Sequence, residues 1–149
     1  MSGSPTLQDR QRWMAVLARA TGDELAAAAE GRLPPFTRLR GPEIGAVMLR
    51  GRAGGTGGAF NMGEATVARC TVRTEDGRIG HAYCLGRDLR QAELAAALDA
   101  ALQDPSRSRE LDEAVIRPLA AAQAARRDIL ARRAAATQVQ FFTLATMRS

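Results

Sequence analysis

The chain of 149 residues contains no lysine, so all 21 of its basic side chains are arginine. This absence excludes a Schiff-base lysine, the lysine of a phosphate-binding loop and a catalytic Ser–Lys pair. Histidine occurs only as His81, with no neighbouring carboxylate or cysteine pair in the sequence. The acidic residues are scattered and form no convincing catalytic pair. We therefore predict no catalytic residue and no metal ligand in this chain.

Long hydrophobic runs are also missing, because no stretch approaches the roughly 20 apolar residues that span a bilayer. The segment 1–5 lacks the charged start and the apolar centre of a signal peptide. We therefore expect a cytoplasmic protein without a membrane partner, in which Cys70 and Cys84 stay reduced. The length fits a single domain covering residues 1–149.

The chain is rich in alanine and arginine, and its formal net charge is +5. Such a charge permits an anionic partner without identifying one, and compositional drift explains it more simply. The arginine pairs 126–127 and 132–133 lack the aromatic neighbours that stack on bases. A basic nucleic-acid-binding or scaffold protein is thus the alternative function, and we predict no nucleic-acid partner.

Helical patterns occupy both ends of the chain. A stripe of apolar residues predicts a first helix around 13–20, and Thr21 with Glu24 forms a capping box for a second over 25–30. Asp88 is a good N-cap for a helix containing Leu94, Leu98 and Leu102. Ser108 is expected to cap a fourth helix. Residues 119–136 favour a helix with few large apolar anchors, which either packs closely on a neighbour or lies exposed.

The middle of the chain predicts strands. Residues 36–40 fit an edge strand, and the apolar run 44–49 is typical of a buried one. Residues 64–74 and 78–85 flank Asp76-Gly77, which indicates a hairpin. Helices, then strands, then helices favour an α+β fold in which an antiparallel sheet with a central hairpin is flanked by N-terminal and C-terminal helices.

The register of this hairpin follows if Asp76 and Gly77 form a two-residue turn. One face, taken as core, then carries Ala68, Cys70 and Val72 against Leu85, Tyr83 and His81. The other face carries Arg69, Thr71 and Arg73 against Cys84, Ala82 and Gly80, and is bare enough for a helix or a ligand to lie close. His81 is expected to be half-buried. The two cysteines fall on opposite faces, which argues against a disulfide.

The glycine-rich loop from Arg52 to Phe60 is the most specific local feature, with four glycines in the five positions 54–58. Such a backbone needs positive φ angles or lets another group approach closely. Arg52, Gly54, Gly55 and Gly57 are the candidate anion- or nucleotide-binding residues, with Arg50 or Arg69 assisting. The loop joins strand to strand and lacks the helix that usually completes a phosphate cradle. A tight structural bend or a partner-docking loop therefore remains the competing interpretation.

The last strand-like segment, Val139 to Leu144, contains the adjacent pair Phe141 and Phe142. Neighbouring side chains on a strand point to opposite sides. One phenylalanine could fill the core while the other meets a partner, or both could be buried.

Taken together, these elements resemble the G subunit of the bacterial carbon–phosphorus lyase system, the PhnG family. The resemblance covers nearly the whole chain and rests on the following residues: Arg12-Trp13-Met14 and Leu17; Gly54-Gly55-Thr56-Gly57 with Phe60, Gly63 and Glu64-Ala65-Thr66; Val72-Arg73, Asp76-Gly77, Gly80 and Gly86-Arg87-Asp88; the helix 92–102; Pro118-Leu119; and Phe141-Phe142-Thr143. Gly58 looks like an additional glycine.

The resemblance implies a non-catalytic or site-completing subunit of the multi-subunit carbon–phosphorus lyase core complex. That complex uses a purine nucleoside triphosphate and a phosphonate to form ribose 1-phosphonate 5-triphosphate. The expected partners are the other subunits of this transferase (the synthase of that triphosphate), especially the I subunit, to which the chemistry is attributed. Phosphonate and nucleotide would be bound through the complex, and no cofactor by this chain alone.

Overall fold

The computed structural model describes residues 5–137. Two helices, α1 (Leu7–Leu17) and α2 (Gly22–Ala29), precede three strands, β1 (Phe36–Arg52), β2 (Ala59–Thr74) and β3 (Ile79–Leu85). The chain then forms α3 (Leu89–Leu102), α4 (Ser108–Leu111), a π-helical turn (Asp112–Ile116) and α5 (Arg117–Ala136). This order confirms the predicted α+β class. Val139–Leu144, with Phe141 and Phe142, lies outside the described residues.

The helix starts follow the capping signals in the sequence. Thr6 and Thr21 form capping boxes with Asp9 and Glu24, respectively. In each box the threonine hydroxyl accepts a hydrogen bond from the backbone N–H of the acidic residue, and the carboxylate accepts one from the backbone N–H of the threonine. The Asp88 carboxylate accepts a hydrogen bond from the Gln91 N–H at 2.9 Å. At α4 the N-cap position belongs to the preceding arginine rather than to Ser108, without a side-chain cap.

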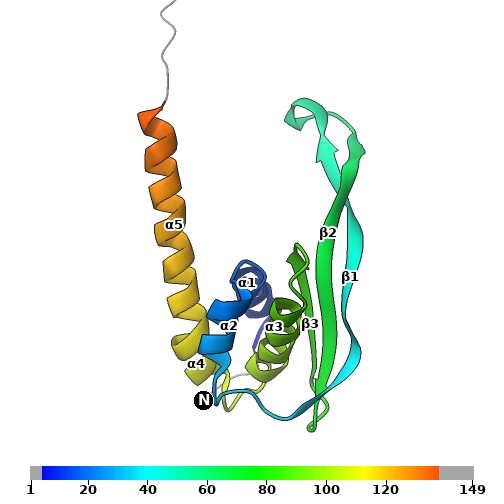
Figure 1. Ribbon diagram of the computed structural model, residues 1–149, viewed down its shortest axis with the longest axis vertical. Helices are drawn as coiled ribbons and strands as arrows, with labels where there is room; N and C mark the ends of the chain where they lie inside the picture. Colours follow the sequence, from blue (N-terminus) through cyan, green and yellow to red (C-terminus); the bar gives the residue numbers. More distant parts are fainter. Residues whose placement is uncertain (1–4, 138–149) are drawn as a thin grey trace, which may run out of the picture.

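The three strands form an antiparallel sheet in the order β1-β2-β3. Helix α3 packs against one face of this sheet, and α1 and α2 lie beyond it (Figure 1). The core between these layers is made of Trp13, Leu17 and Leu25, the small residues of α3, and Ala68, Cys70 and Val72 of β2. Burying this single continuous layer is the main source of stability.

The hairpin register differs by one residue from the prediction. Cys70 lies opposite Ala82, and Val72 opposite Gly80. The loop has three residues rather than two, because the Thr74 N–H donates to the Arg78 carbonyl at 3.0 Å. Gly77 takes φ +88°, as three-residue hairpin loops require.

This shift exchanges the partners on each face of the hairpin. Gly80, Ala82 and Cys84 face α3 and are buried, whereas the side chains of His81, Tyr83 and Leu85 are exposed on the opposite face. The expectation of a half-buried His81 is therefore wrong. Both cysteines are on the buried face and remain free thiols, so the prediction of opposite faces is wrong while the absence of a disulfide between them is confirmed.

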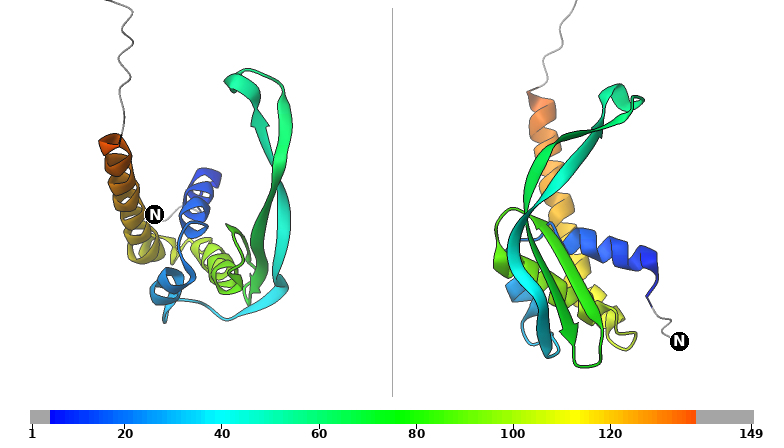
Figure 2. Two further views of the ribbon diagram at one scale, coloured as in Figure 1. Left: turned by 45° about the horizontal axis from the view of Figure 1, so that its top comes forward. Right: turned by 90° about the vertical axis from the view of Figure 1, so that its right-hand side faces the viewer.

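Two elements project from the body in the same direction, on opposite sides of it (Figures 1 and 2). One is the distal part of the β1–β2 hairpin, which we call the arm (residues 44–65). The other is α5, along which only Leu119 and Gln123 are buried. The predicted edge strand and buried strand are one continuous strand, β1, and its distal half is not buried.

Candidate functional site

The glycine loop forms the tip of the arm. A 3₁₀ turn, Ala53–Gly55, follows β1 directly, and β2 begins at Ala59. Gly54 and Gly55 have φ angles of +62° and +76°, a region that favours glycine. The Gly57 N–H donates to the Ala53 carbonyl at 3.0 Å, and a Cβ at Gly57 would stand 2.7 Å from that oxygen. Three of the four predicted loop residues are thus explained by the bend itself.

The remaining loop residue, Arg52, is exposed beside the bend, as is Arg50 two residues earlier. Neither arginine forms an ion pair within residues 5–137. Arg69 does not join them, because its Nε lies 2.7 Å from Oε1 of Glu43 in the proximal part of the hairpin. Hydrogen bonds from Arg69 and then Arg40 lower the pKa of the Glu43 carboxyl. The positive charge at the tip is therefore limited to Arg50 and Arg52.

The loop lies at the end of the arm, away from the other described elements (Figure 2). Its backbone and the two arginines could approach an anion from one side only. A polyphosphate held there would need groups from another molecule on its remaining sides. Anion binding by Arg52, Gly54, Gly55 and Gly57 therefore stays a prediction, and it concerns a composite site.

The arm carries apolar side chains along its length. The exposed fractions are 53% for Met48, 49% for Phe60 and 65% for Met62, and Ile44 and Leu49 are also about half-exposed. The prediction that residues 44–49 form a buried strand is wrong, because α3 covers only the proximal part of the sheet. Several large apolar side chains exposed along one projecting element are typical of an interaction surface.

Helix α5 presents a second exposed surface. Ile129 and Leu130 are 43% and 63% exposed and lie beyond the part of the helix that contacts the body. Arg126 near its middle donates to Oε1 of Glu24 at 2.6 Å, which ties the helix to α2. The sequence left open whether residues 119–136 pack closely on a neighbour or lie exposed, and the structure supports exposure beyond Arg126.

Asp99 is the most buried acidic residue of the described chain, and its role was not predicted from the sequence. Its side chain is fully buried and accepts hydrogen bonds from the Trp13 indole N–H at 2.8 Å, from Arg10 Nη2 at 2.8 Å and from the His81 backbone N–H at 2.9 Å. This network joins α1, α3 and β3. The pKa of Arg10 is raised, chiefly by its hydrogen bond to Asp99. All acceptor positions are occupied from within, so the group is structural.

The only sequence signal for the structural role of Asp99 was an aspartate within the apolar sequence of α3.

The His81 ring is exposed, and its Nδ1 lies 3.2 Å from the Thr71 hydroxyl. No acidic side chain approaches the ring closely enough to form an ion pair with it in the described chain. His81 therefore lacks the partners of a catalytic histidine.

The two thiols are poor nucleophiles. Burial raises the pKa of Cys84 to about 11, with a further contribution from the Asp88 charge, and burial also raises the pKa of Cys70. Thiolate rather than thiol is the reactive form, so neither side chain reacts readily at neutral pH. Within residues 5–137, no group of three or more potential metal ligands is found.

None of the helices in the described part of the chain is both long and apolar enough to cross a bilayer.

Some of the charged side chains at the surface pair with one another. Arg38 with Glu93 joins β1 to α3, and Arg12 with Asp112 joins α1 to the π-helical turn. The arginine excess is thus partly used in ion pairs between elements.

Comparison with known proteins agrees with this description. The family model described as "Phosphonate metabolism protein PhnG" matches residues 8–147. A curated relative from Rhizobium meliloti (strain 1021), named "Alpha-D-ribose 1-methylphosphonate 5-triphosphate synthase subunit PhnG", is 44% identical over 137 residues, which cover 91% of this chain and 87% of the relative. The match extends across the helices, the arm with its glycine loop, and α5. The chain belongs to the PhnG family.

Proposed function

We propose that this protein is a non-catalytic subunit of a ribose 1-methylphosphonate 5-triphosphate synthase, the core complex of the carbon–phosphorus lyase pathway. Its role is to bind the other subunits and hold their arrangement while they carry out the reaction. The family membership and the name of the Rhizobium relative support this assignment. The observation that carries it is the exposed apolar arm.

The physical argument begins with the stability of the arm. A two-stranded hairpin is at best marginally stable in water, and it needs a third strand or a packed face. Beyond α3 the arm has neither within the described chain, yet it exposes Met48, Phe60 and Met62. Burying those side chains against another protein would stabilise both the arm and the complex, since each buried large apolar side chain contributes about 1.5–3 kcal/mol.

Helix α5 fits the same role. Its exposed Ile129 and Leu130 lie on an element that projects in the same direction as the arm (Figure 1). A partner that fills the space between the two would contact both at once. We assign the I subunit to the space between the arm and α5, because the resemblance to the PhnG family attributes the transfer chemistry to that subunit.

In this assignment, the purine nucleoside triphosphate and the phosphonate are substrates bound by the assembled complex. Four pockets of the described chain each contain at most one arginine, too few to neutralise a triphosphate. The pocket between α1 and β3, for example, is lined mainly by apolar side chains. The chain would contribute at most a loop to a site formed elsewhere.

The experiment that tests the proposal is co-expression of this chain with a tagged I subunit, followed by affinity purification and mass determination. We expect a stable complex of defined stoichiometry, and an isolated chain that self-associates through its exposed arm. A well-behaved monomer that does not co-purify with the I subunit or the remaining subunits would contradict the proposal.

A second role is favoured by one observation, the two arginines beside the glycine loop that form no ion pair within residues 5–137. In this proposal Arg52 and the N–H groups around Gly54, Gly55 and Gly57 contact the triphosphate of the nucleotide in a site completed by a partner. Replacing Gly55 by alanine in the assembled complex should weaken nucleotide binding without dissociating the subunits. Unchanged nucleotide affinity would exclude this role and leave the loop as a structural bend.

A further inference from the structure

β3 is an edge strand, and residues 5–137 supply hydrogen-bond partners to its outer edge over only half of its length. The Gly86 N–H donates to the Thr66 carbonyl and the Arg78 carbonyl accepts from Thr74, so even-numbered residues bond to β2. In an antiparallel strand the odd-numbered residues then point their N–H and C=O groups outward. These outward groups belong to residues 79, 81, 83 and 85.

Side chains of this chain bond to one outward group of each residue in the first half of that edge. The Ile79 carbonyl accepts a hydrogen bond from Gln103 Nε2 at 2.8 Å, and the His81 N–H donates to Oδ2 of Asp99 at 2.9 Å. No hydrogen bond from residues 5–137 reaches the outward N–H or carbonyl of Tyr83. An open strand edge of this kind is a template for pairing with another chain.

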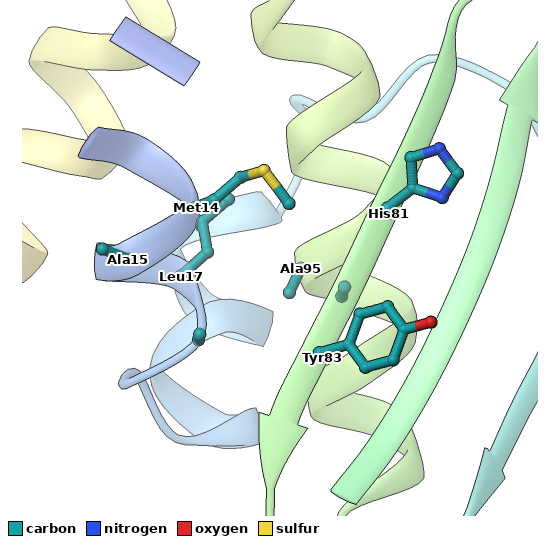
Figure 3. A pocket seen from close by; sticks show the side chains of 8 residues that line it. Met14, Ala15, Leu17, His81, Tyr83 and Ala95 are labelled. Atoms are coloured by element: carbon teal, nitrogen blue, oxygen red, sulfur yellow. The ribbon is translucent and has the colours of Figure 1, made fainter. Parts of the chain in front are cut away.

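A groove runs beside the open half. It has a volume of about 240 Å³, and Met14, Leu17 and Ala18 of α1 line one side while His81 to Tyr83 line the other. Ala95 of α3 contributes to the lining from below. Figure 3 shows the Met14 side chain extending towards β3, with the rings of His81 and Tyr83 on the far side of the strand. The space next to the strand edge is therefore lined by small and apolar groups.

Charges of both signs lie at one end of this groove, from Arg19, Arg87 and the Asp88 carboxylate that caps α3. Arg19 follows α1, Arg87 follows β3, and both are exposed. Neither forms an ion pair within residues 5–137. The Gln91 side chain, in the first turn of α3, donates to the carbonyls of Ala18 and Ala20, so the end of α1 is held near the start of α3. A carboxylate on an occupant could approach Arg19 and Arg87 at this end, where the Asp88 carboxylate already accepts from the Gln91 N–H.

We infer that the groove between α1 and β3 binds an extended segment of another subunit of the synthase, which adds a fourth strand to the sheet beside β3. This inference rests on the proposed function as a subunit. Main-chain hydrogen bonds to Tyr83 would provide the pairing, and an apolar side chain of the segment would fill the groove above Ala95. An acidic residue of the segment would face Arg19 and Arg87. This is the strand-addition mode of peptide recognition.

The identity of the occupant can be tested by photo-crosslinking in the assembled complex. A benzoylphenylalanine replaces Ala18 in the groove wall, and the matched control carries it at Ala27 on α2, outside the groove. We expect the Ala18 position to crosslink to a continuous peptide of a different subunit, and the Ala27 position not to reach that peptide. A crosslink to a second copy or to this chain itself, or no crosslink, would overturn the inference.

A pair of substitutions tests the hydrogen-bonding mode. Tyr83→Pro removes the outward N–H, and proline is tolerated on the free side of an edge strand. Tyr83→Thr removes the same ring but keeps the N–H. We expect Tyr83→Pro to weaken subunit binding about tenfold or more, and Tyr83→Thr to change it less than threefold. Equal losses in both variants would overturn main-chain pairing.

The two proposals fail in different ways. If no subunit co-purifies with the unmodified chain, the proposed function is wrong. If the complex forms normally but the Ala18 crosslinker finds no other subunit, the proposed function stands and the groove inference is wrong. Should Tyr83→Pro not fold, as judged by circular dichroism, the crosslink alone decides.

Discussion

Gly80 on β3 lies directly against Ala100 on α3, since a Cβ at Gly80 would stand 2.7 Å from the Ala100 backbone nitrogen. The two elements touch backbone to backbone. The alanines that fill α3 on this side, such as Ala96, allow the same close approach. Here glycine is needed for space rather than for an unusual φ angle.

This contact predicts that Gly80→Ala destabilises the fold. The added methyl group must displace α3 from the sheet, and overpacking of this kind typically costs about 1–3 kcal/mol. Chemical denaturation of the isolated domain measures the change. Gly58→Ala is the matched control, because nothing lies within 4 Å of its added Cβ and its φ is not positive. Similar losses in both variants would show that the close approach is not limiting.

The same contact explains why the sequence predicted the hairpin but not its register. Asp76-Gly77 fits a two-residue turn, and a loop with Gly77 as its third residue fits equally well. Tyr83 and Leu85 then looked like core residues because they are large and apolar. In the structure the small residues of β3 are buried instead, because α3 approaches too closely for larger ones. The sequence contained this signal in the many alanines of α3.

The starts of α2 and α3 followed from local signals, since capping by Thr21 and Asp88 acts over three residues. The Thr6 cap was not recognised, so α1 (Leu7–Leu17) begins earlier than the apolar stripe around 13–20 indicated. The exposure of the arm did not follow. An apolar run such as 44–49 looks the same whether it is covered by its own chain or by a partner. Likewise, Asp99 acquires its partners from α1 and β3, which are 86 and 18 residues away in the sequence.

Asp99→Asn should be strongly destabilising. The substitution leaves the Arg10 charge without its partner and turns an amide NH₂ towards groups that are themselves donors. Breaking a buried ion pair from one side costs about 3–5 kcal/mol, and we expect a value near the lower end because Arg10 is partly solvated.

The control for this variant is Asp112→Asn, which breaks the ion pairs with Arg12 and Arg117 at the surface. Such pairs contribute about 0–1 kcal/mol. Unfolding by urea, followed by circular dichroism, should separate the two variants clearly. A loss at Asp99 no larger than that at Asp112 would mean that the buried network contributes little to stability.

The free energy of unfolding at alkaline pH should depend on the ionisation of the Cys84 thiol. Its pKa is raised by burial to about 11 in the folded state, while the unfolded thiol titrates near its ordinary value of 9.0. Between these values the unfolded state has lost the proton and the folded state retains it. The free energy of unfolding should therefore decrease as the pH rises from 9 to 11, by about 1–3 kcal/mol.

Replacing Cys84 by alanine removes this titration and should flatten the decline over that range. The measurement is a series of urea titrations at fixed ionic strength for both proteins. The thiol should also react slowly with iodoacetamide at pH 8 in the native state and rapidly in urea. An identical alkaline decline in the alanine variant would assign it to other groups.

The arm provides the sharpest test of the subunit role. Met48→Asp and Phe60→Asp each place a charge on a surface that we expect to be buried in the complex. Because both side chains are about half-exposed in the monomer, its free energy of unfolding should change little, while self-association through the arm should decrease. Removal of a central apolar anchor from an interface typically costs 2 kcal/mol or more, which corresponds to an affinity about 30-fold lower.

Leu7→Asp serves as the matched control, since Leu7 is 73% exposed at the start of α1, where a carboxylate suits the helix N-terminus. Co-purification with the I subunit, quantified against input, should be retained for Leu7→Asp and lost for the two arm variants. If all three variants co-purify equally, the arm is not the principal docking element, and α5 with Ile129 and Leu130 becomes the surface to test.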